Sequence, residues 1–273
     1  MDLIDLVQGR VSILYEGPWT EDMVRISVNK THSPYISREL KQIAAERYNL
    51  RQKERAIRGL RALSDNDVMH LCREHSCITK KEAYLAMGPI KYSQYCIATP
   101  EVANMLECTV LDLPIGMAVN VVIVTPDKKV VMMKASGHVD FPERIDVPGG
   151  VYSGDTPFMA IYKEISEEVG LHREELLNIR LLGMSTRFED RTILVLTFFA
   201  DTLLNSEEVL ERAKHAPDSW EGQILFLVCE SDALRHYLLE NGKDSKRKMV
   251  SSCFSALVLA GRHMWGQEWS KIK

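Results

Sequence analysis

The sequence is poor in cysteine and has no long apolar run. Its six cysteines are spread over 273 residues without a CxxC pair, which is unlike the dense disulfide framework of a small secreted domain, so we expect reduced thiols. The most apolar segments, residues 117–126 and 193–200, are far shorter than the roughly 20 residues of a membrane-spanning helix. The amino-terminal segment carries acids where a secretory signal has bases, so we expect a cytoplasmic protein without a membrane partner.

The chain also lacks an excess of positive charge. Lys and Arg total 34 against 38 Asp and Glu, a formal net charge of -4. A protein that binds nucleic acid through its phosphate backbone is usually more basic, so no nucleic-acid partner is expected. A small polyanion is still an acceptable ligand, because a local group of cations or metal ions can receive it. With 45% apolar and 26% charged residues, the composition is that of a globular protein.

Hydrophobic periodicity predicts strands mixed with few helices, which favours an α+β fold with a mixed sheet. In the first part of the chain the pattern predicts a hairpin of residues 10–15 and 23–28, helices over 37–63 and 65–74, and a short strand with a turn within 83–97. Further along it predicts strands at 117–125, 130–134, 179–183, 193–200 and 224–228, and helices at 156–169, 207–214 and 251–264.

The helix predicted over residues 156–169 carries an acidic face. Glu164, Glu167 and Glu168 lie three and four residues apart and therefore share one side of the helix. Such a row is most often a solvated face. Three neighbouring carboxylates repel one another, however, and a divalent cation such as Mg²⁺ relieves that repulsion. Gly149 and Gly150 precede the helix, and glycine lets the backbone turn tightly and approach a ligand closely.

The spacing of these residues resembles the signature of the Nudix hydrolases, Gx5Ex7REUxEExGU, where U is a bulky apolar residue. Here the pattern reads Gly149, Asp155, Lys163, Glu164, Ile165, Glu167, Glu168, Gly170 and Leu171. Two positions depart conservatively: Asp155 stands for Glu and Lys163 for Arg. The resemblance implies a Nudix α/β/α sandwich over residues 113–273, preceded by an N-terminal α+β region over 1–112 that recognises the substrate.

The resemblance also implies a function. Nudix hydrolases cleave the diphosphate of a nucleoside diphosphate linked to another moiety, using Mg²⁺ or Mn²⁺. By position, Glu164, Glu167 and Glu168 are the expected metal ligands. The expected catalytic base is Glu167 or a later carboxylate, for which Glu221 is the candidate, since Nudix enzymes often place an acid just before a strand there. Gly149, Gly150 and Gly170 shape the motif, and Lys163 is expected to pair with Asp155.

A narrower resemblance, to UDP-sugar diphosphatases of this family, covers scattered parts of residues 88–150. It rests on GPIKYSQYCIAT at 88–99, DLPIG at 112–116 and DVPGG at 146–150, and implies cleavage of a UDP-sugar to UMP and sugar 1-phosphate. Tyr92 and Tyr95 are candidates to stack on the base, and Arg187 to hold a phosphate.

Several alternatives stay open. The substrate class is also compatible with ADP-ribose or a dinucleotide. A Nudix-like module that senses a nucleotide without cleaving it is a rival of another class, and the departures at Asp155 and Lys163 keep it open, although a pure binder has no need of three repelling acids. A homodimer is possible, but no stretch of the sequence indicates one.

Overall fold

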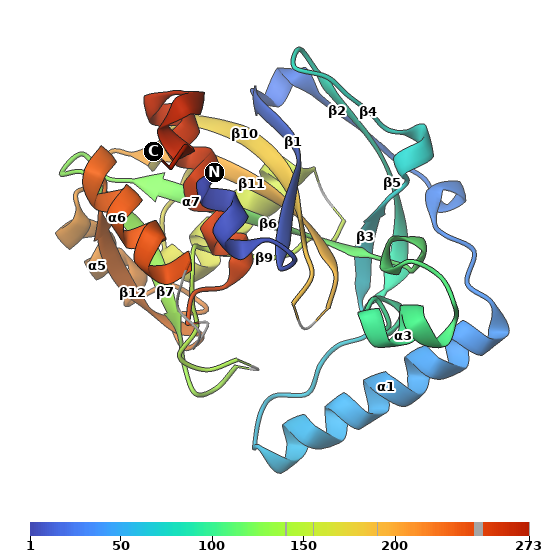
Figure 1. Cartoon of the computed structure of the whole chain (residues 1–273). Helices are drawn as coiled ribbons and strands as arrows, with labels where there is room; N and C mark the ends of the chain where they lie inside the picture. The colour runs from blue at the N-terminus through green and yellow to red at the C-terminus, as the bar shows by residue number, and fades with distance from the viewer. Residues whose placement is uncertain (140, 155, 190, 243–247, 273) are drawn as a thin grey trace.

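The computed structural model describes residues 1–139, 141–154, 156–189, 191–242 and 248–272 (Figure 1). The strands are β1 (Val11–Trp19), β2 (Val24–Val28), β3 (Asp67–Leu71), β4 (Cys77–Ile78), β5 (Ala83–Lys91), β6 (Gly116–Val124), β7 (Lys129–Ala135), β8 (Ile145–Asp146), β9 (Gly149–Val151), β10 (Leu176–Arg187), β11 (Ile193–Thr202) and β12 (Gly222–Val228). The helices are α1 (Arg38–Ile57), α2 (Tyr92–Tyr95), α3 (Pro100–Met105), α4 (Pro157–Glu164), α5 (Ser206–Ala213), α6 (Ser231–Gly242) and α7 (Ser251–Trp265).

The larger sheet is mixed. Among the described residues its strands run in the order β1-β10-β11-β6-β7-β12, with β8 paired to β7 and β9 to β6. The β11–β6 pair is parallel, and the pairs that join β1 to β10, β10 to β11 and β12 to β7 are antiparallel. Strand β1 comes from the amino-terminal region and forms one edge of this sheet.

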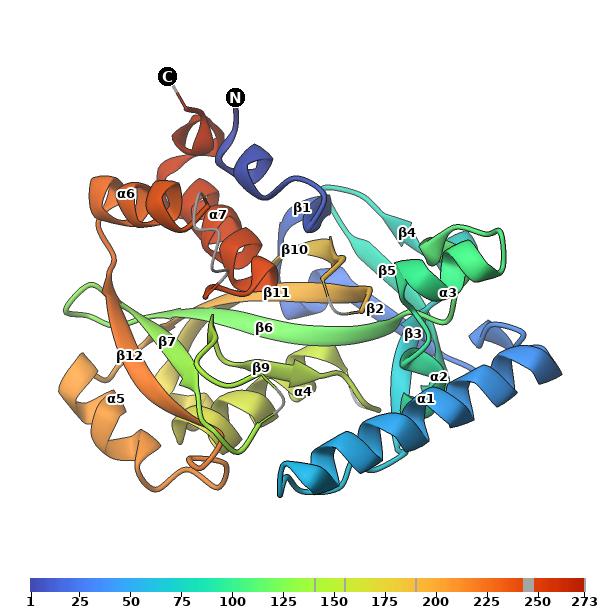
Figure 2. The same ribbon diagram turned by 60° about the horizontal axis from the view of Figure 1, so that its bottom comes forward.

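Helices cover both faces of the larger sheet, as Figure 2 shows. Helix α7 packs across β1, β6, β10 and β11 on one face and is joined there by α6, whereas α4 packs on β6 from the other face. Because side chains alternate across a strand, Met117, Val119 and Val121 of β6 belong to the core under α4, and Val122 belongs to the core under α7. This is the α/β/α sandwich that the sequence predicted.

The N-terminal region adds a smaller sheet beside the sandwich. Strand β5 lies at its centre, parallel to β2 and antiparallel to β3 and β4. Helix α1 lies along the outside of this region and packs on α2 (Figure 1). Of the twenty residues of α1 only Ala44 is buried, so most of this helix is partly or fully open to solvent.

Most of the predicted elements are confirmed, including the strands at the centre of the sheet and the acidic helix. Thr156 caps α4 by accepting a hydrogen bond from the Met159 backbone N–H at 3.2 Å. A π-helical turn, Ile165–Val169, continues α4, and Gly170 ends it with a φ of +73°, a conformation that glycine adopts without strain. All six cysteines are free, as expected.

Three predictions in and around the N-terminal region were wrong. The predicted hairpin does not form, because β1 pairs with β10 and β2 with β5. Residues 65–74 form β3 and a 3₁₀ turn instead of a helix, since Val68 and Leu71 are buried against β5 and its surroundings. The Gly88-Pro89 pair lies inside β5 rather than in a turn, where a Cβ on Gly88 would lie 2.2 Å from the Ser33 backbone nitrogen.

Helix α6 was not predicted at all. Its only buried residues are Leu234 and Leu238, and so narrow an apolar stripe gives a weak periodic signal. No helix in the described ranges is long and apolar enough to cross a membrane.

Candidate active site

Two glycines bring the loop before α4 against the centre of the sheet. Gly149 and Gly150 lie in β9, opposite Asn120 and Val119 of β6. Gly149 has a φ of +158°, and a Cβ there would lie 2.3 Å from the Val119 carbonyl oxygen. The absence of a side chain therefore lets the two backbones meet, which explains in physical terms why the motif begins with glycine.

Glu168 is tied to this glycine turn. Its Oε2 accepts a hydrogen bond of 2.7 Å from the Gly149 backbone N–H, and the residue is 9% exposed. Burial raises the pKa of Glu168 well above its ordinary value, and the charge of Glu164 raises it further, while the bond from Gly149 works in the opposite direction. The carboxylate is therefore positioned by the backbone in a place that penalises its negative charge.

Glu164 lies one helical turn earlier, beside Gly150. A Cβ on Gly150 would come within 2.5 Å of its Oε2. Burial raises the pKa of Glu164 to about 7, with the charge of Glu167 as the next cause and Lys163 opposing. Lys163 Nζ lies 3.6 Å from Glu167 Oε2. Asp155, the predicted partner of Lys163, lies outside the described residues.

Glu221, from a later segment of the chain, lies near the same acidic residues. It directly precedes β12, and burial raises its pKa, followed by the charges of Asp218 and Glu167. Asp218, which the sequence did not single out, sits beside this group because its backbone N–H donates to the Glu167 carbonyl at 2.8 Å. We call Glu164, Glu167, Glu168 and Glu221 the acidic cluster.

The acidic cluster suits a hard divalent cation in its chemistry. Its donors are all carboxylate oxygens, and burial together with mutual repulsion raises the pKa of Glu164, Glu168 and Glu221, a penalty that a cation offsets. Within the described ranges no three His, Cys, Asp or Glu side chains converge closely enough to hold an ion as they stand. Glu167 faces Lys163 and Glu168 faces Gly149, so side-chain rotation is needed for common ligation.

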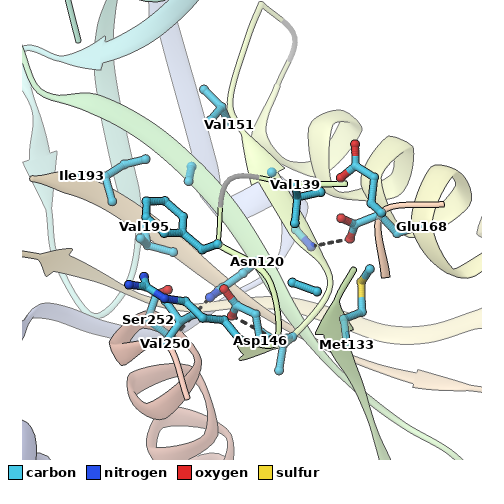
Figure 3. Close-up of a pocket in the computed structure, with 18 of the residues that line it drawn as sticks. Asn120, Met133, Val139, Asp146, Val151, Glu168, Ile193, Val195, Val250 and Ser252 are labelled. Atoms are coloured by element: carbon cyan, nitrogen blue, oxygen red, sulfur yellow. Dashed lines mark hydrogen bonds between the residues drawn. The ribbon is translucent and has the colours of Figure 1, made fainter. Parts of the chain in front are cut away.

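A cleft of about 400 Å³ opens beside the acidic cluster. Figure 3 shows Glu168 on one side of it and Ile193 and Val195 on the opposite side, with Asn120 between them. Of the predicted site residues, Gly149, Gly150, Glu168, Glu221, Arg187 and Tyr95 line this cleft. Tyr92 does not line it but packs edge-on against Tyr95, with ring centroids 5.7 Å apart.

The structure adds polar residues that the sequence did not single out. Asn120 is 5% exposed, lines the cleft, and its Oδ1 has no hydrogen-bond partner among the described residues. Burial raises the pKa of Asp146, another lining residue, to about 6, with the charge of Arg187 opposing. Neither residue could be singled out from the sequence, because a single Asn or Asp in a strand produces no periodic pattern.

Arginines also line the cleft. Arg51 and Arg55 come from α1, and Arg187 and Arg191 flank the connection between β10 and β11. The cleft is thus lined by carboxylates and by guanidinium groups, contributed by both the sandwich and the N-terminal region. The four-residue spacing of Arg51 and Arg55 on one helix face was a signal in the sequence.

A comparison with known protein families identifies the family of this chain. The sequence model described as the NUDIX domain matches residues 114–250, half of the chain. The chain belongs to the Nudix family. The match includes the glycine turn, α4 and all four members of the acidic cluster. It ends at Val250, directly before α7.

Solved structures show likenesses of low sequence identity. A mutT/nudix family protein from Listeria innocua is 16% identical with a TM-score of 0.38, over 55% of this chain and 93% of that one. An Ap4A hydrolase from C. elegans is 14% identical with a TM-score of 0.34, over 55% and 98%. NrtR from Shewanella oneidensis, in complex with a 27mer DNA, is 12% identical with a TM-score of 0.37, over 56% and 63%. No curated protein matches the chain.

Proposed function

We propose that this Nudix protein hydrolyses the diphosphate of a nucleoside diphosphate linked to another moiety, with Mg²⁺ or Mn²⁺. The observation that carries the proposal is the acidic cluster: four neighbouring carboxylates, of which Glu164 and Glu168 lie at the Gly149–Gly150 turn, beside a cleft large enough for a small molecule. A module that only binds nucleotides gains nothing from so many repelling acids beside its ligand.

Glu164, Glu167 and Glu168 are the residues that would hold the cation, which would neutralise diphosphate charge and lower the pKa of a bound water. Glu167 and Glu221 are the candidates to take the proton from the attacking water. The Glu167 side chain is 33% exposed, so water reaches it, and Glu221 lines the cleft. Arg187, also a lining residue, is placed to bind a phosphate oxygen.

Residues 1–112 are proposed to recognise the rest of the substrate. Support comes from the cleft, which residues of α1 and α2 line together with residues of the sandwich. Trp220, which is 40% exposed, offers aromatic surface there, whereas Tyr95 also lines the cleft but is buried. A UDP-sugar is the leading substrate, on the resemblance at residues 88–150, and its products would be UMP and sugar 1-phosphate.

The test is a substrate panel with product identification. Purified protein is incubated with UDP-glucose, ADP-ribose, NADH, coenzyme A and diadenosine polyphosphates, each with Mg²⁺ or Mn²⁺. Release of UMP and glucose 1-phosphate supports the leading substrate, and release of AMP from ADP-ribose supports the alternative. Tight binding of one compound without cleavage under either metal would contradict hydrolysis and support the sensor.

A pair of variants ties any activity to the acidic cluster. Glu164→Gln removes a half-buried acid of the cluster, whereas Glu174→Gln removes an exposed acid from a neighbouring 3₁₀ turn. We expect loss of turnover only in the first variant. Equal turnover in both would show that Glu164 has no part in the reaction.

A further inference from the structure

The buried amide of Asn120 lies at the cleft with its oxygen unused. Asn120 stands at the middle of β6, two residues before Val122 of the core under α7, so its side chain lies on that face of the sheet. Its Nδ2 donates to the Ser252 carbonyl at 3.5 Å, and its Oδ1 accepts no hydrogen bond from the described residues. A buried acceptor without a donor costs free energy, and a ligand in the cleft can supply that donor once the amide rotates toward it.

Asparagine is an unfavourable residue for this strand. It is depleted in strands generally, and Val119, Val121 and Val122 around it are apolar and at most 1% exposed. Thr197, its register partner in β11, is also buried with a hydroxyl that lacks a partner among the described residues, but it does not line the cleft. Asn120 thus differs from Thr197 in offering its polar group to a space that a ligand can enter.

Asp146 provides a second acceptor at the same part of the cleft. It lines the cleft from β8, and its Oδ1 accepts a hydrogen bond of 2.9 Å from the Val147 backbone N–H. A carboxylate keeps further acceptor sites when one of them is filled. Burial, and after it the charge of Asp146, raises the pKa of the Cys253 thiol, so Asp146 lies near the start of α7, as Asn120 does. Figure 3 shows both residues there, close to Ser252. We call Asn120 and Asp146 the acceptor pair.

The acceptor pair lies next to the groups proposed to hold the diphosphate. Asn120 is the register partner of Gly149, whose backbone N–H donates to Glu168 at 2.7 Å. Burial raises the pKa of Asp146 and the charge of Arg187 opposes this rise, so that guanidinium is a near neighbour. In a nucleoside diphosphate linked to a sugar, both groups attached directly to the diphosphate are sugars, and the base is one sugar further away. Sugar hydroxyls are hydrogen-bond donors, which is what two acceptors require.

We propose that Asn120 and Asp146 determine substrate specificity by accepting hydrogen bonds from a hydroxyl of the sugar next to the diphosphate. The inference rests on the proposed function for the position of the diphosphate, and it deepens that function by naming the part of the substrate that is recognised. The hydroxyl belongs to the ribose or to the distal sugar, because both carry the same donor chemistry at this distance from the phosphates.

Binding is measured by calorimetry with Ca²⁺ in place of Mg²⁺, and chromatography confirms that each nucleotide stays intact. The probes are UDP-glucose, ADP-ribose and their deoxy analogues, each of which lacks one hydroxyl of the ribose or of the distal sugar. We expect one analogue of the parent that binds to bind about three- to tenfold more weakly than that parent. The hydroxyl that it lacks identifies which sugar is the source. Equal affinity of all analogues, or binding of neither parent, would overturn the proposal.

Three variants serve as tests and control. Asn120→Leu keeps the branching of the side chain and removes its polar atoms, and Asp146→Asn keeps its shape and removes an acceptor. Thr197→Val removes a buried polar group that does not line the cleft. The hydroxyl effect should shrink at least severalfold in the first two and persist in the third. An unchanged effect in either acceptor variant, or an equal loss in the control, would overturn the proposal.

Urea unfolding shows that a loss of the hydroxyl effect is not a loss of fold. Asn120 makes one long hydrogen bond and leaves its oxygen unpaired among the described residues, so Asn120→Leu should not lower the midpoint of unfolding. Asp146→Asn remains as an independent test, because it changes a different strand.

Turnover with Mg²⁺ separates this inference from the proposed function. Cleavage of a parent nucleotide with equal affinity for all its deoxy analogues would contradict the role of the acceptor pair and support hydrolysis. A hydroxyl effect that depends on Asn120, without cleavage of any compound, would do the reverse.

Discussion

Replacing Gly150 with alanine should damage the acidic cluster without unfolding the protein. A Cβ on Gly150 would lie 2.5 Å from Glu164 Oε2 and 2.6 Å from its Cδ, while an ordinary contact begins at 3.4 Å. The Glu164 carboxylate must therefore retreat by about 0.9 Å. It is the end of a flexible side chain, so the backbone has no need to move. Displacement of a catalytic group by about 1 Å is expected to reduce turnover about 100-fold.

The stability of this variant should change little. Gly150 does not have a positive φ, so alanine fits its backbone conformation, and a Gly→Ala change of this kind stabilises by about 0.4–1 kcal/mol through the unfolded state. Moving the Glu164 side chain opposes that gain. We expect the free energy of unfolding to stay within about 1 kcal/mol of the wild type.

The assay combines kcat/KM on the substrate found in the panel with urea unfolding followed by circular dichroism. Gly137→Ala is the matched control, since a Cβ there meets no atom within 4 Å, and it should leave both quantities unchanged. Full activity of a folded Gly150→Ala protein would refute the assigned position of Glu164. A loss of stability above about 2 kcal/mol would show that the backbone, not the carboxylate, absorbs the clash.

Three further outcomes are expected. Glu168→Gln should abolish metal-dependent cleavage, measured by product release, because an amide cannot neutralise a cation, and unchanged turnover would contradict its role. Gly170→Ala should destabilise the protein by about 1–3 kcal/mol in urea unfolding, since its φ is +73° and a Cβ would lie 2.7 Å from the Arg212 carbonyl oxygen; an unchanged midpoint would refute this. Burial raises the pKa of Asp146 from 3.8 to about 6, so the folded state favours the protonated acid. Stability should therefore fall by up to about 3 kcal/mol as the pH rises through that interval. Asp146→Asn should remove this fall, and parallel pH profiles of the two proteins would contradict it.

Local sequence patterns were sufficient to predict the motif and many of the elements of the sandwich. The glycine turn, the acidic helix and its Gly170 end all follow from neighbours within one segment, and the structure has each of them where the sequence predicted. Strands β6, β7 and β11 are strongly apolar, so their positions were also predictable from the sequence. Such features depend on backbone conformation and side-chain alternation, which act over a few residues.

Pairing between distant segments was not predictable in this way. Strand β1 pairs with β10 rather than with its neighbour β2, and residues 67–71 form a strand because β5 lies beside them. Both outcomes depend on which surface is available for burial, and tertiary contacts override local preference there. The same reason explains why the predicted hairpin and the predicted helix at 65–74 were wrong.

The sequence by itself determined the family motif, the α+β class and the three acids of one helix, because all of these are encoded at fixed spacing along one segment. Only the tertiary structure decided that Glu221 joins those acids, that the half-buried Asp146 and the buried Asn120 line the same cleft, and that α1 contributes arginines to it. Burial and charge proximity are properties of the packed chain: they arise when residues more than a hundred positions apart, such as Arg51 and Arg191, come to line one space.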